Sequence, residues 1–270
     1  MIAIQDQEFK LLVQYVYSYC GINLKNKKTL VEARLNSLLL EKGFADFSAY
    51  HHYLLNDGSG DAIKTFIDRI STNHTYFMRE AQHFSYLQNN VLPYLKAVVR
   101  SKDLRIWSAG CSSGEEPYTM AMLIDDFFGD EKPLWNTKIL ATDISSRALK
   151  KARDGIYSDE EIRPVPSFWK MRYFQKINRS SNAVLDNLKN EIIFRKFNLM
   201  EKRFPFKKKF HVIFCRNVML YFDNASKREL VNHLYDCTET GGYLFIGQSE
   251  VLNRDECRYQ YIAPAIYRKR

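Results

Sequence analysis

The sequence has few of the residues that build disulfide frameworks, metal centres and membrane spans. Its five cysteines are an odd number, are scattered and form no CxxC pair, so we expect neither a disulfide framework nor a zinc site. The six histidines show no HExxH spacing, and we expect no metal. No apolar run is long enough to span a bilayer, and the N-terminus lacks the layout of a secretory signal. We therefore expect a cytoplasmic protein that does not insert into a membrane. The cysteines are Cys20, Cys111, Cys215, Cys237 and Cys257.

Acidic residues are also in deficit, with 31 Asp and Glu against 40 Lys and Arg, which gives a formal net charge of +9. This excess favours an anionic partner, and nucleic acid, anionic lipid or an acidic protein surface would each fit. Three local runs hold much of it, at 25–28, 202–209 and 268–270, although each run alone is most simply a solvated face or a frayed terminus. A chain of 270 residues with 46% hydrophobic content can bury a sizeable core and is long enough for two domains.

The first part of the chain has the apolar spacing of helices. Helical periodicity runs through 9–16, 30–39, 47–54 and 63–70, and Gly21 and Gly43 end the first two of these segments. Residues 57–60, Asp-Gly-Ser-Gly, read as a loop. No strand-like alternation occurs before residue 100. We predict a small all-α domain, placed at residues 1–85.

From about residue 104 the pattern changes to short strands alternating with helices. We expect strands at 104–109, 138–142, 192–197, 211–215 and 243–246, with helices after the first, second and fourth. This alternation predicts a mostly parallel sheet with covering helices and right-handed crossovers. A last strand around 261–267, after a turn at Gly241-Gly242, would add an antiparallel edge. Residues 155–190 fit the alternation poorly and are either an inserted subdomain or a long functional loop.

The segment 105–118 contains the strongest functional signal. A short apolar strand runs into a loop bounded by Gly110 and Gly114, and a helix opens at Glu115-Glu116-Pro117. Glycines at such a turn let the backbone approach a ligand closely. Two carboxylates stand where dinucleotide-binding loops leave free amides for phosphate, so they would repel a pyrophosphate and suit an ammonium or sulfonium charge. The loop favours S-adenosylmethionine (SAM) over NAD or ATP.

Further polar residues follow the other predicted strands. Asp143 ends the second strand, where an acid commonly accepts hydrogen bonds from ribose hydroxyls, although an N-cap or surface role is the alternative. Asn198-Leu199 and Arg216-Asn217 follow the third and fourth strands. Each pair alone is ordinary loop chemistry. Because ligands of open α/β sheets bind along this edge, the three together outline one cleft.

The segment 71–80, upstream of the sheet, is dense in polar side chains. Taken by itself it is most simply a capped helix start, with Thr72 or Asn73 as the cap and Arg79 on a solvated face.

Four sequence blocks occur in order and resemble the chemotaxis-receptor glutamate O-methyltransferases, the CheR family. They are NHTYFMRE at 73–80, WSAGCSSGEEPY at 107–118, ATD at 141–143 and FCRNVMLYFD at 214–223. The similarity runs from about residue 10 to about residue 250. Met78 departs from the family, which often has a second Phe there, and we expect only a packing change.

The resemblance implies an α/β architecture: a small N-terminal all-α domain followed by a doubly wound SAM-dependent methyltransferase domain at 86–270. That domain would have a mostly parallel seven-stranded sheet, with a small antiparallel β-subdomain inserted at about 156–190. The implied activity transfers the methyl group of SAM to glutamate side chains of bacterial chemotaxis receptors, forming methyl esters and S-adenosylhomocysteine (SAH) in sensory adaptation. A glutamate with a pKa of about 4.3 is already ionised at neutral pH, so no general base is required.

The resemblance also assigns roles to individual residues. Arg79 and Tyr221 would face the transferring methyl and the incoming carboxylate, and the fork of Arg79 suits a carboxylate better than a lysine would. Tyr221 could alternatively be an aromatic packing beside Phe222. A basic helix would meet the helical methylation region of the receptor, and in some members the β-subdomain also docks a short C-terminal receptor peptide. Including Gly110 of the glycine-bounded loop, the expected cofactor contacts are Asn73, Thr75, Arg79, Gly110, Glu116, Asp143, Asn198, Leu199, Arg216 and Asn217. The expected receptor contacts are Lys27, Lys28 and Arg34.

Three alternatives stay open. A nucleic-acid methyltransferase shares this fold and would suit a pI near 9.2, but amino-methylating enzymes of that kind tend to carry an Asn/Asp-Pro-Pro-aromatic motif where residues 215–221 read CRNVMLY, so we expect no nucleic-acid partner. A cofactor-sensing or scaffold protein could keep the fold without catalysis, although no cofactor position is lost here. The same enzyme could also act on a receptor-like protein that controls motility or surface growth.

Overall fold

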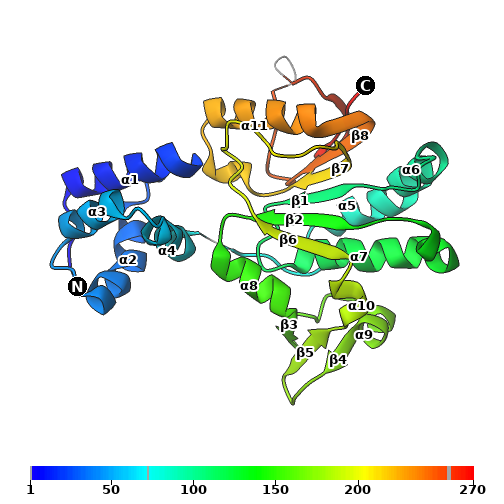
Figure 1. Cartoon of the computed structure of the whole chain (residues 1–270), viewed down its shortest axis with the longest axis horizontal. Helices are drawn as coiled ribbons and strands as arrows, with labels where there is room; N and C mark the ends of the chain where they lie inside the picture. The colour runs from blue at the N-terminus through cyan, green and yellow to red at the C-terminus, as the bar shows by residue number, and fades with distance from the viewer. Residues whose placement is uncertain (1, 72, 254–256) are drawn as a thin grey trace.

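The computed structural model describes residues 2–71, 73–253 and 257–270. A helical unit, residues 2–71, stands beside a larger α/β unit (Figure 1). The predicted all-α first part is confirmed, and its breaks fall at Gly21 and Gly43, which end helices in the left-handed region with φ of 70° and 73°. Leu12, Val16 and Leu35 are fully buried in the core of this unit. Its helices are α1 (Asp6–Cys20), α2 (Lys28–Lys42), α3 (Phe47–Asn56) and α4 (Asp61–Ile70).

The connection between the units is not the capped helix start considered from the sequence. Residues 73–80 form no helix, so Asn73 is not an N-cap, and Thr72 lies outside the described residues. The backbone oxygen of Asn73 accepts a hydrogen bond from Ser112, and its side chain donates to Ser145. These contacts hold the segment against the sheet. Helical structure resumes in α5 (Ala81–Tyr86), a π-helical turn η1 (Leu87–Val91) and α6 (Leu92–Val98).

The α/β unit contains the predicted mostly parallel seven-stranded sheet, in the order β6-β2-β1-β7-β8-β10-β9. The pairs from β6 to β8 are parallel, and β10 pairs antiparallel with both β8 and β9. The predicted last strand is therefore confirmed as an antiparallel edge, but it is two strands. The strands are β1 (Ile106–Ala109), β2 (Ile139–Asp143), β6 (Ile192–Lys196), β7 (Phe210–Cys215), β8 (Thr238–Ile246), β9 (Gln260–Ala263) and β10 (Ile266–Arg268).

The turn predicted at Gly241-Gly242 is wrong, because both residues lie inside β8. Gly241 has φ of 81°, and the register between β7 and β8 shifts near this point. A Cβ on Gly242 would meet the backbone oxygens of Glu239 and His211 at 2.9 Å. These glycines therefore permit an irregular, close strand pairing, which a sequence pattern does not distinguish from a turn.

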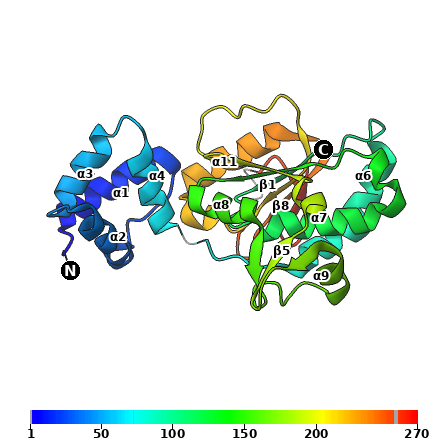
Figure 2. The same cartoon turned by 60° about the horizontal axis from the view of Figure 1, so that its bottom comes forward.

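Helices cover both faces of the sheet (Figure 2). Residues of α5, α6 and α7 (Glu115–Phe128) pack with Ile106 and Phe214, whereas α11 (Asn224–Cys237) packs with Trp107 and Ile213 on the opposite face. The other helices of this unit are η2 (Gly129–Leu134), α8 (Ser146–Asp154) and η3 (Met219–Tyr221). Among the described residues, no helix combines the length and the apolar character needed to cross a bilayer.

The stretch that fitted the alternation poorly is an inserted subdomain and not a long loop. Its three strands form a separate antiparallel sheet in the order β3-β5-β4, which lies beyond α8 (Figure 1). The elements are β3 (Ile156–Ser158), α9 (Ser167–Tyr173), β4 (Phe174–Lys176), β5 (Ser181–Val184) and α10 (Asp186–Lys189).

Candidate functional site

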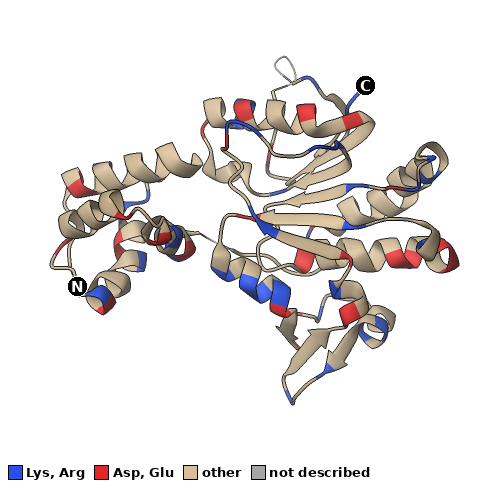
Figure 3. Ribbon diagram, in the orientation of Figure 1, with Lys and Arg blue, Asp and Glu red and all other residues tan. Residues whose placement is uncertain are grey.

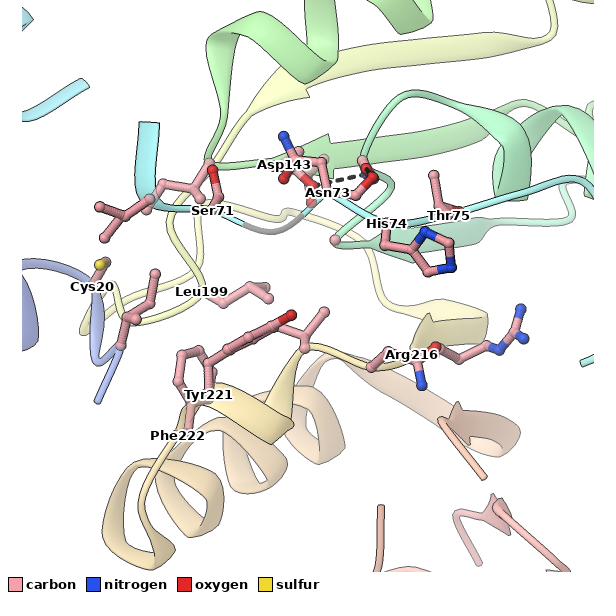
Figure 4. A pocket seen from close by; sticks show the side chains of 18 of the residues that line it. Cys20, Ser71, Asn73, His74, Thr75, Asp143, Leu199, Arg216, Tyr221 and Phe222 are labelled. Carbon is pink, nitrogen blue, oxygen red and sulfur yellow. Dashed lines mark hydrogen bonds between the residues drawn. The ribbon is translucent and has the colours of Figure 1, made fainter. Parts of the chain in front are cut away.

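A cavity lies between the helical unit and the carboxyl ends of β1, β2, β6 and β7 (Figure 4). All ten residues predicted to contact a cofactor line it, although they come from five separate stretches of the chain. Tyr221 and Lys27 line it as well, whereas Lys28 and Arg34 do not. Sequence reasoning did not assign several further lining residues from the helical unit and the strand ends, among them Ile22, Asn23, Leu24, Ser112, Thr142 and Ile144.

The glycine-bounded loop after β1 has a backbone that only glycine fits. Gly110 has φ of 92°, and a Cβ there would stand 2.4 Å from Cγ2 of Val218. The amides of Gly110 and Cys111 donate to the backbone oxygen of Thr142 at 2.8 and 2.9 Å. The loop is therefore fixed against the end of β2, and the first turn of α7 faces the cavity.

Asp143 is held rigidly at the end of β2. Its two carboxylate oxygens each accept one backbone hydrogen bond of 2.8 Å, from Ser112 and Ser145. Burial raises the pKa of Asp143, and these amides oppose that shift. Asp143 is not the N-cap of α8, because the side chain of Ser145 makes that cap. Each oxygen keeps acceptor capacity, which suits hydroxyl donors such as those of a ribose.

Arg216 is buried between two carboxylates. Its guanidinium nitrogens lie 2.9 Å from Oε2 of Glu116 and 3.0 Å from Oε2 of Glu80. The other oxygen of Glu116 accepts a 2.7 Å bond from Ser108. Burial raises the pKa of Glu116, and the charge of Arg216 opposes this shift. Sequence reasoning missed Glu80, because nothing in local spacing shows that it meets a residue 136 positions away.

Arg79 is placed differently from Arg216. Its guanidinium donates a 2.7 Å hydrogen bond to the backbone oxygen of His74 and lies 5.9 Å from the ring centre of Tyr76. Among the described residues it makes no ion pair with a carboxylate of the chain. It therefore presents an uncompensated positive charge to the cavity, which suits an anionic ligand.

Tyr221 reaches into the cavity from η3 (Figure 4). Its side chain is 39% exposed, whereas the neighbouring Phe222 is buried at 9%. The backbone oxygen of Tyr221 accepts a 2.8 Å hydrogen bond from the amide of Asn23, which follows α1. The helical unit therefore fixes the segment that carries this tyrosine.

Two further side-chain bonds join the units beside the cavity. The hydroxyl of Tyr17 donates to Asp223 at 2.6 Å, and the side-chain amide of Asn198 donates to the backbone oxygen of Tyr19 at 2.6 Å. A Cβ on Gly21 would contact Met200 at 2.8 Å, so the end of α1 lies very close to the loop after β6. The helical unit is thus a wall of the cavity.

The three predicted receptor-contact residues have distinct surroundings. Lys27 is exposed at the start of α2, and Lys28 pairs with Asp6. Arg34 donates hydrogen bonds of 2.6 and 3.1 Å to the backbone oxygens of Ile70 and Ser71, at the end of α4. Arg34 therefore also has a structural role, because it satisfies carbonyl groups at a helix end.

Comparison with known proteins agrees with this geometry. Residues 7–71 match the all-alpha domain of CheR methyltransferases, and residues 73–267 match their SAM binding domain. The chain belongs to the CheR methyltransferase family. The resemblance seen in the four sequence blocks and the prediction of SAM as the cofactor are thereby confirmed.

Curated relatives align with this CheR-family chain over nearly its whole length. It is 43% identical to a chemotaxis protein methyltransferase of Borreliella burgdorferi, covering 99% of this chain and 96% of the relative. It is 34% identical to one of Escherichia coli, covering 98% of this chain and 92% of the relative. A third, from Salmonella typhimurium, is 34% identical over 92% of this chain and 85% of the relative.

The residues present fit SAM. Asp143 keeps acceptor capacity at both carboxylate oxygens, whereas the charge of Glu116, in the first turn of α7, is already paired with Arg216. Ile144 and Leu199 add apolar surface of the kind that a purine ring packs against.

Proposed function

We propose that this CheR-family chain transfers the methyl group of SAM to glutamate side chains of chemotaxis receptors, forming methyl esters and SAH during sensory adaptation. The observation that supports this most is Arg79. Its guanidinium, which pairs with no carboxylate among the described residues, lies in the same cavity as the cofactor residues and suits an acceptor that is itself a carboxylate. The curated relatives are called chemotaxis protein methyltransferases, in keeping with a receptor substrate.

In this proposal, bound SAM supplies an electrophilic methyl group on a sulfonium. Arg79 holds the acceptor carboxylate, and the Tyr221 hydroxyl orients the attacking oxygen. Transfer to the acceptor oxygen would break the C–S bond and leave its electron pair on the sulfur of SAH. No proton moves, because the acceptor is already ionised at neutral pH.

Rate enhancement would come mainly from alignment. Holding the acceptor oxygen in line with the methyl carbon and the sulfur can contribute roughly 7–11 kcal/mol at best. Arg216 and Asp143 serve this alignment because their own hydrogen bonds fix them before any ligand arrives. The hydrogen bond from Asn23 to the backbone oxygen of Tyr221 also joins the helical unit to the segment that carries this tyrosine.

We propose that the protein acts in the cytoplasm and binds the receptor through two of its surfaces. Lys27, Lys28 and Arg34, on and beside α2, would meet the helical methylation region of the receptor. The inserted subdomain would dock a short C-terminal receptor peptide where a receptor carries one. The domain boundary predicted between residues 85 and 86 falls inside α5, whose Phe84 packs against the sheet.

The proposal is tested by incubating the protein with SAM and a receptor cytoplasmic fragment and mapping added methyl groups by tandem mass spectrometry. Methyl groups should map to glutamate side chains and be absent when those glutamates are replaced by alanine. Methylation of lysine or arginine side chains, or of added RNA in place of the receptor, would refute the proposed acceptor.

A further inference from the structure

The turn after β7, residues 216–221, carries three site residues in a backbone shape that needs support. We call this segment the post-β7 turn. It presents Arg216, Asn217 and Tyr221 to the cavity. Asn217 has φ of 60°, in the left-handed region, which Asn adopts more readily than most residues with a Cβ. Contacts from outside the turn also hold it in place.

Glu250, which lies beyond β8, supplies such a contact. It is 7% exposed, and its Oε2 accepts hydrogen bonds from the amides of Asn217 at 2.9 Å and Gly247 at 2.6 Å. Burial raises the pKa of Glu250, while the amides of Gly247, Asn217, Met219 and Leu220 oppose the shift. The carboxylate therefore faces backbone N–H groups at three positions of the post-β7 turn, at residues 217, 219 and 220.

A close backbone approach makes this contact possible. A Cβ on Gly247 would stand 2.4 Å from Nδ2 of Asn217 and 2.9 Å from Oε2 of Glu250. Only glycine at 247 lets the segment 247–250 close on the turn without displacing Asn217. On its other side the Asn217 side chain donates to Oε1 of Glu80 at 3.3 Å. Asn217 therefore donates hydrogen bonds to two carboxylates, one on either side.

The burial of Glu250 is costly, because a carboxylate in a dry interior is stabilised chiefly by a cation or by several hydrogen bonds. No cation among the described residues pairs with it, and its Oε1 is buried without a hydrogen bond of normal geometry. An uncharged side chain of similar shape would avoid the cost of burying a charge. The best explanation for a carboxylate at this position is that it accepts hydrogen bonds from backbone N–H groups and holds them in place.

We propose that Glu250 is a positioning residue: its carboxylate clamps the post-β7 turn and so sets Asn217 against the cofactor and Tyr221 toward the acceptor. This inference rests on the proposed function for its catalytic part. Its binding part concerns the cofactor alone.

The test compares Glu250→Gln with Glu229→Gln, a matched change at an exposed glutamate on α11. SAH affinity is measured by titration calorimetry and kcat by methyl transfer, with circular dichroism to verify folding. In Glu250→Gln the Kd for SAH should rise at least about tenfold, the equivalent of one hydrogen bond to a charged group, and kcat should fall. The KM for the receptor should stay within about twofold, because docking involves other surfaces. The control should match wild type in all three quantities.

A second variant approaches the turn from the opposite side. Gly247→Ala keeps the carboxylate but displaces Asn217, and it should show the same loss of SAH affinity. It decides the matter if Glu250→Gln does not fold. Wild-type affinity for SAH in a folded Glu250→Gln protein, or in Gly247→Ala, would overturn the proposal. Calorimetry needs no receptor, so a failure of receptor methylation would leave this test intact.

Discussion

Arg79 and Arg216 have the same side chain and line the same cavity, yet their surroundings give them different roles. Arg216 is compensated by Glu80 and Glu116 before any ligand binds, whereas Arg79 bonds to a backbone oxygen and, within the described part of the chain, to no carboxylate. A charge that is already paired holds structure, and one that is unpaired is available to a substrate. Replacing each arginine by alanine should therefore affect different properties: activity for Arg79 and stability for Arg216.

Arg79→Ala should lose most methyl transfer while the protein stays folded, because the change removes the group that holds the acceptor but leaves no buried charge unpaired. Transfer to a receptor fragment and circular dichroism measure the two parts. Wild-type turnover in Arg79→Ala would refute the assignment.

Arg216→Ala should instead destabilise the protein by about 3–5 kcal/mol, because two largely buried carboxylates, 12% and 13% exposed, lose their partner. The free energy of unfolding, measured by urea titration, gives the value. Arg153→Ala, at an exposed position on α8, is the comparison. Equal stability of the two variants would contradict the structural role of Arg216.

His83 predicts a pH dependence of stability. It is 2% exposed, and burial, with the nearby charge of Arg216, lowers its pKa to about 4. Its Nδ1 lies 3.2 Å from Oε2 of Glu80, but without the geometry of a hydrogen bond. Because the unfolded state binds a proton below about pH 6.5 and the folded state resists it, stability falls as pH drops from 6.5 toward 4.

His83→Phe should remove this dependence. Between pH 7 and pH 5 the wild type should lose about 2 kcal/mol more of unfolding free energy than the variant. Buried carboxylates such as Glu116, whose pKa is raised, contribute in the opposite direction but equally in both proteins. Parallel pH curves for the two proteins would show that His83 does not titrate in this way.

At the scale of elements, local chemistry was predictable from the sequence and long-range pairing was not. The loop between Gly110 and Gly114 was identified because two glycines and the start of α7 lie within a few residues of each other. The post-β7 turn depends on Glu80 and Glu250, which are 137 and 33 positions from Asn217, and no spacing rule connects them. The shape of residues 73–80, which the sequence alone did not show, has the same cause, because contacts with the α/β unit set it.

Gly110→Ala should abolish SAM binding, because a Cβ at φ of 92° is strained and would overlap Val218. Gly43→Ala is a matched control: that glycine also has positive φ, at 73°, but nothing lies within 4 Å of its added Cβ. Calorimetry with SAH separates the two, since the control should lose stability without losing affinity. Normal SAH affinity in Gly110→Ala would show that the loop does not approach the cofactor.

For the molecule as a whole, the helical unit and the charge distribution matter most. Lys and Arg residues are spread over both units, with several along α8 (Figure 3). The net charge of +9 comes from 40 basic and 31 acidic residues. Such a field increases the rate of encounter with an acidic partner and is screened by salt over about 10 Å at 0.1 M.

The KM for the receptor fragment should therefore rise with ionic strength, while the Kd for SAH should change little because the cofactor residues lie inside a cavity. Initial rates and calorimetry at low and high salt provide both numbers. A KM that does not depend on salt would show that the basic surface has no part in docking.

The most direct measurement of the proposed function is transfer of a tritiated methyl group from SAM to a receptor cytoplasmic fragment, followed by alkaline hydrolysis. Label released as volatile methanol is the predicted result, because a carboxyl methyl ester is cleaved by base. Label that stays on the protein after hydrolysis would contradict carboxyl methylation, and so would an unlabelled receptor when calorimetry shows that SAM binds.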